Sequence, residues 1–100
     1  MKSGPSNFDR NVSKLAVAYI GDKTAQVIVY DLSRYNKIKY KYDKNSIIDQ
    51  IITNLDTNIR SVHLCNGGTQ LIIHVNADIL VYFLGNFGTL TVMDALIPTN

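Results

Sequence analysis

The chain has 100 residues, of which 46% are hydrophobic and 18% are charged, and its formal net charge is +2. This length and balance indicate one globular domain and exclude an intrinsically disordered chain. No apolar run reaches the roughly 18 residues of a membrane-spanning helix, and the single cysteine excludes an internal disulfide.

Residues 1–11 are predicted to form a flexible N-terminal tail. Their first part reads Met-Lys-Ser-Gly-Pro-Ser-Asn and lacks the apolar core of a secretion signal. We therefore expect a cytoplasmic protein without a membrane association, in which residues 12–97 form a single domain.

The first two predicted strands cover residues 13–20 and 25–32. Both are rich in apolar and β-branched residues, and the intervening Gly21-Asp22-Lys23 is typical of a tight turn. A β-hairpin is the natural interpretation.

A third strand is predicted over residues 37–42, where lysine alternates with isoleucine or tyrosine. A strand with this period shows its lysines on one face and its apolar side chains on the other. The lysines indicate either an edge strand protected against aggregation or a surface that binds phosphates or an acidic protein. The candidate binding residues are Arg34, Tyr35, Lys37, Lys39, Tyr40, Lys41, Tyr42 and Lys44.

The segment 46–55 is predicted to be a helix that packs on the sheet. Either Ser46 or Asn45 is a suitable N-cap, and Asp49 in the first turn suits the helix dipole. The apolar residues Ile47, Ile48, Ile51, Ile52 and Leu55 recur with the spacing of a helical stripe.

Four further strands are predicted over residues 59–65, 69–75, 79–84 and 89–93, as an antiparallel meander. The loops between them contain Gly, Asn and Asp, which tolerate positive φ. The strands at 69–75 and 79–84 are apolar on both faces, which indicates central positions. The expected fold class is therefore α+β, with about seven mainly antiparallel strands and one central helix in the order βββαββββ.

The sequence contains few candidates for a catalytic nucleophile or a metal ligand. Cys65 and His63 lie two apart on a predicted strand, a minimal requirement for a thiol nucleophile and its base. Together with His74 they lack the spacing and the fourth ligand of a zinc site. We predict no catalytic residue, no metal and no cofactor.

Charge is distributed unevenly along the chain. Residues 1–60 contain all ten cations and six Asp (10 − 6 = +4), whereas residues 61–100 contain no Lys or Arg and two Asp. One helix cannot cover both faces of such a sheet, so either the sheet curls into a half-barrel around the helix, or its bare face, with the uncharged C-terminal strands, meets a second copy. The leading prediction is a non-enzymatic protein-interaction or inhibitor module that forms a homodimer and binds another protein. The alternatives are nucleic-acid binding through residues 34–44 and, more remotely, a Cys65-dependent enzyme.

Overall fold

The computed structural model describes residues 1–33, 47–84 and 90–93. Within them the chain forms eight β-strands and no α-helix, so the expected α+β class is wrong and the described part is all-β. The strands are β1 (Lys2–Asp9), β2 (Lys14–Ile20), β3 (Ala25–Asp31), β4 (Ile48–Leu55), β5 (Ile59–Cys65), β6 (Gln70–Val75), β7 (Asp78–Leu84) and β8 (Leu90–Met93). None of the described segments is a helix long and apolar enough to cross a membrane.

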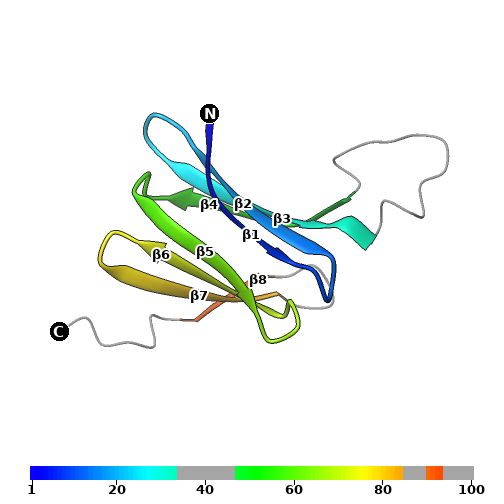
Figure 1. Cartoon of the computed structure of the whole chain (residues 1–100). Helices are drawn as coiled ribbons and strands as arrows, with labels where there is room; N and C mark the ends of the chain where they lie inside the picture. The colour runs from blue at the N-terminus through cyan, green and yellow to red at the C-terminus, as the bar shows by residue number, and fades with distance from the viewer. Residues whose placement is uncertain (34–46, 85–89, 94–100) are drawn as a thin grey trace.

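The strands form two four-stranded antiparallel sheets, which we call the N-terminal sheet (β1–β4) and the C-terminal sheet (β5–β8). In each sheet the spatial order follows the chain order (Figure 1). The predicted meander is therefore confirmed for the C-terminal strands, and β6 and β7 take its two central positions as expected.

One hydrophobic core lies between the sheets. Alternate residues of the strands point inward, as a period of two requires, and residues of both sheets belong to one buried cluster. Val27, Val29, Leu71 and Ile73 are fully buried at its centre. Burial also raises the pKa of the Tyr82 hydroxyl, because desolvation disfavours the phenolate. Each sheet thus covers the inner face of the other, which a helix was expected to do.

The predicted helix at 46–55 is instead the strand β4, which pairs with β3. The register shifts twice along this pair, and each shift gives β4 one extra residue, as in a β-bulge. The buried residues of the segment are consequently Ile47, Gln50, Ile52 and Leu55, at spacings of three, two and three. This bulged spacing resembles the period of a helix, although Ile51 is 48% exposed.

The N-terminal segment also differs from the expected tail. Lys2–Asp9 forms the edge strand β1, which pairs antiparallel with β2. Its register shifts between Ser3 and Ser6, around Gly4 and Pro5. Proline has no N–H for a ladder bond and is tolerated at a bulge of an edge strand, so this composition is compatible with pairing.

Contacts outside the hydrophobic core also join the two sheets within the described residues. The backbone N–H of Leu64 donates to Asn7 Oδ1 over 2.9 Å, and Lys14 Nζ donates to the Gly68 carbonyl over 3.3 Å. Gly68 has a φ of +77°, and a Cβ there would lie 2.7 Å from a methyl group of Val12. Only glycine fits this turn, because a side chain would force the β5–β6 hairpin away from Val12.

Candidate functional site

The predicted lysine–tyrosine site lies outside the described residues. Every one of its members, from Arg34 to Lys44, belongs to the segment 34–46. Edge protection, binding of an acidic protein and nucleic-acid binding therefore all stay predictions for this segment.

The structure places Cys65 and His63 on β5 with the same outward orientation. In the pairing with β6, Cys65 lies opposite Gln70 and His63 lies opposite Ile72. The Cys65 thiol donates to Gln70 Oε1 over 3.7 Å, so its hydrogen bond goes to an amide rather than to an imidazole. An amide is not a general base, so the contact that the structure shows for the Cys65 thiol is not that of a nucleophile with its base. Among the described residues no group of three or more His, Cys, Asp or Glu could hold a metal ion.

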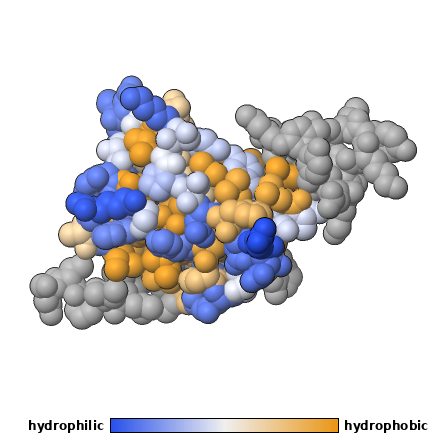
Figure 2. Space-filling view, in the orientation of Figure 1, coloured by the Kyte–Doolittle hydropathy of each residue, from blue (hydrophilic) through white to orange (hydrophobic). Residues whose placement is uncertain are grey.

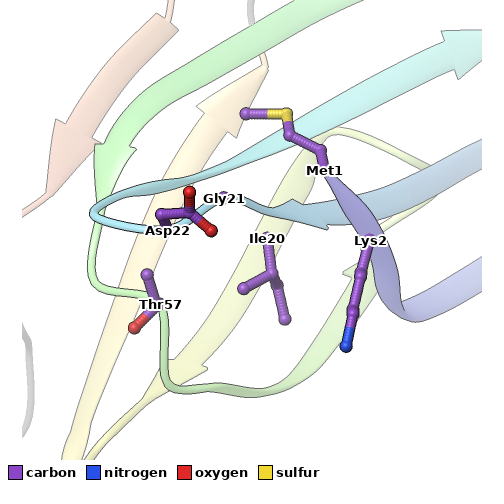
Figure 3. Close-up of a pocket in the computed structure, with 6 residues that line it drawn as sticks. All are labelled: Met1, Lys2, Ile20, Gly21, Asp22 and Thr57. Atoms are coloured by element: carbon purple, nitrogen blue, oxygen red, sulfur yellow. The ribbon is translucent and has the colours of Figure 1, made fainter.

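An open cleft lies where the N-terminus meets the β2–β3 turn. It encloses about 710 Å³ and is lined by Met1, Lys2, Ile20, Gly21, Asp22 and Thr57. Figure 3 shows the Lys2 ammonium, the Asp22 carboxylate and the Thr57 hydroxyl spread around the cleft, with no common point to which they converge. Such an arrangement lacks the convergent polar groups with which a small-molecule site orients its ligand.

A partly buried ion pair lies at the end of the core near the β5–β6 hairpin. Lys14 Nζ is 3.2 Å from Asp49 Oδ2, and the two side chains are 20% and 11% exposed. Asp49 is the extra residue of a β4 bulge, between Ile48 opposite Tyr30 and Gln50 opposite Val29. The bulge therefore lets two consecutive polar residues, Asp49 and Gln50, both avoid the solvent.

Gln50 is 5% exposed, and its Nε2 has no hydrogen-bond partner among the residues that the structure describes. A buried unpaired amide destabilises the fold, so Gln50→Met should raise the free energy of unfolding by about 1 kcal/mol. Urea denaturation followed by circular dichroism measures this change. The matched control is Gln26→Met at a half-buried position of β3, with an expected change within about 0.5 kcal/mol. A less stable Gln50→Met protein would instead show that the amide is satisfied by a buried water.

The outer face of the N-terminal sheet combines apolar side chains with the neutral polar Ser3, Ser6 and Gln26, and it lacks charged residues among its described strand positions. Register places Phe8 beside Leu15 in one row, and Val17, Ile28 and Ile51 in another. Phe8 is 52% exposed and Ile51 is 48% exposed. Above the centre of this face, the hydroxyls of Tyr19 and Tyr30 are joined by a hydrogen bond of 2.8 Å.

The outer face of the C-terminal sheet combines apolar and neutral polar side chains. The alternation of β5, β6 and β7 points every second residue outward, and the pairing arranges these residues in three rows. The first row is Ser61, His74 and Ile79, the second is His63, Ile72 and Val81, and the third is Cys65, Gln70 and Phe83. We call these nine residues the C-terminal face; none of them is a lysine, an arginine or a carboxylate.

The sequence shows that residues 61–100 contain no Lys or Arg, but it does not show which of these residues share the C-terminal face. The face depends on the strand register, which brings residues from three strands into rows. Figure 2 shows that hydrophobic residues also reach the surface elsewhere, in patches between hydrophilic ones. Comparison of the chain with protein families, with curated proteins and with solved structures finds no significant match.

Proposed function

We propose that this chain is a small protein-interaction or inhibitor module that self-associates through the C-terminal face. The observation that carries the proposal is the composition of that face: four apolar side chains, no permanent charge, and only one exposed member, His63. Interaction surfaces on soluble proteins are typically apolar at their centre and depleted of charged residues.

The composition of this face is compatible with a second copy as its occupant. In a two-fold symmetric dimer, the same patch of both subunits meets, so each charged residue would approach charges of its own sign. The C-terminal face contains no Lys, Arg, Asp or Glu and therefore meets a second copy without such repulsion. The free thiol of Cys65 on this face is compatible with a reducing cytoplasm, which is part of the proposal.

The test is the mass of the tag-free protein by size-exclusion chromatography with light scattering at tens of micromolar. We expect a dimer, twice the 11.2 kDa of the chain. Val81→Lys, in the middle row of the C-terminal face, should give a monomer because two lysines would be buried against an apolar surface. Circular dichroism confirms that the variant is folded.

The matched control is Ile51→Lys, which places the same charge on the outer face of the N-terminal sheet. This variant should remain a dimer. If Ile51→Lys is monomeric and Val81→Lys is not, the N-terminal sheet is the interface instead. A monomeric wild-type protein overturns the proposal, and co-eluting material with strong absorbance at 260 nm supports the nucleic-acid alternative.

A further inference from the structure

We infer that self-association through the C-terminal face is controlled by pH, with His63 and His74 as the sensing groups. This inference rests on the function proposed above. Both imidazoles point outward from adjacent strands, His63 from β5 and His74 from β6. His63 lies opposite Ile72, and His74 lies opposite Ser61 and Ile79, so the two histidines occupy neighbouring rows on a diagonal.

None of the other residues of the C-terminal face carries a carboxylate that could pair with His63 or His74. On β5 the neighbouring outward side chains are Ser61 and Cys65, and on β6 they are Gln70 and Ile72. From β7 the histidines are faced by Ile79 and Val81. The residues of β8 are Leu90, Thr91, Val92 and Met93, none of which ionises.

The nearest charged residues of these strands lie toward one end of the sheet. Arg60 is exposed at the shift of register between Ile59 and Ser61. Asp78 is exposed at the start of β7, where it lies opposite Val75. The pairing therefore gives the C-terminal face an apolar and neutral environment for both imidazoles.

A dimer built on this face buries four histidines, two from each copy. Histidine is the side chain that commonly changes its charge between about pH 5 and pH 8. An imidazolium buried without an anionic partner is strongly disfavoured, and four of them would also repel one another. In the single chain His63 is exposed and His74 is half-buried, so a charge on either imidazole costs less desolvation there than in the dimer.

The sign of the pH dependence follows from this difference in proton binding. Because the dimer holds fewer protons than two monomers, dimerisation releases protons and weakens as the pH falls. The dimer is thus favoured near neutral pH and is lost on acidification. A protein with this property would release its second copy, and expose the C-terminal face, in an acidified environment.

Sedimentation equilibrium over a dilution series measures the dimer dissociation constant at about pH 7.5 and about pH 5.5, at constant ionic strength. We expect the constant of the wild-type protein to rise at least about tenfold at the lower pH. In His63→Gln/His74→Gln, which keeps polar side chains but cannot titrate in this range, the rise should be less than about twofold. Circular dichroism at both pH values confirms that folded protein is compared.

The outcomes separate this inference from the proposed function. A wild-type monomer at pH 7.5 overturns both, whereas a dimer with the same dissociation constant at both pH values overturns the pH control alone. If the double variant does not dimerise, the single variants His63→Gln and His74→Gln decide. In each single variant the dissociation constant should rise less between about pH 7.5 and about pH 5.5 than in the wild type. If the rise is unchanged in both single variants, the inference is overturned.

Discussion

Ile52→Ala is expected to lower the free energy of unfolding by about 2–5 kcal/mol, whereas Ile51→Ala should lower it by less than about 1 kcal/mol. The two residues are neighbours of the same type on β4, yet Ile52 is 3% exposed and Ile51 is 48% exposed. Removing Ile52 leaves a cavity between the sheets, while Ile51 points outward. Chemical denaturation monitored by circular dichroism measures both changes.

This pair also distinguishes the observed strand from the helix that the sequence predicts over residues 46–55. In a helix Ile51 and Ile52 would lie on one buried stripe, and the two alanine substitutions would cost similar free energies. Equal losses for the two variants would therefore contradict the bulged strand. Such a difference is a large fraction of the 5–15 kcal/mol that stabilises a typical domain, so it is readily measured.

Lys14→Met should lower the free energy of unfolding by about 2–3 kcal/mol, because Lys14 loses both its ion pair with Asp49 and its hydrogen bond to the Gly68 carbonyl at a largely buried position. In the double variant Lys14→Met/Asp49→Asn the loss should be smaller than the sum of the two single losses, since both single variants break the same ion pair. Denaturation of the two single variants and the double variant gives the coupling energy directly.

Lys23→Met is the control for this cycle, because Lys23 is exposed in the β2–β3 turn. Its stability should stay within about 0.5 kcal/mol of the wild type. Equal effects of Lys14→Met and Lys23→Met would show that the ion pair contributes nothing measurable, as is common for exposed pairs.

Much of the strand pattern could be predicted from the sequence, because period-two alternation and turn residues act locally. The turns after β5 and β6 are an example: Asn66, Gly67, Gly68 and Asn76 all adopt the positive φ that their residue types suggested. The predicted strands at 59–65 and 79–84 coincide with β5 and β7 to within one residue.

The segments that could not be predicted depend on pairing with distant residues. The two bulges of β4 interrupt its alternation of inward and outward side chains. Within the segment only Asn54, whose φ is +61°, is of a residue type that indicates such an irregularity. The strand β1 contains glycine, proline and two serines, and it is a strand because β2 offers it a partner. Tertiary context decides both cases, as it often does for β-propensity.

The candidate site also has one feature that the sequence predicts and another that depends on strand pairing. The lack of cations after residue 60 can be counted in the sequence, but the rows of the C-terminal face require the register of β5, β6 and β7. His63 and His74 are eleven positions apart in the chain, and only the hairpin between them makes them neighbours on one surface.

Each sheet consists of consecutive strands, so the N-terminal sheet can fold earlier than the C-terminal sheet during synthesis. The pairings that the structure describes in the N-terminal sheet involve only residues up to Leu55, so this sheet can form before the rest of the chain has been made. Its inner face, with Val27 and Val29, then has no cover until β5, β6 and β7 emerge from the ribosome. During that interval the uncovered apolar face exposes the nascent chain to aggregation.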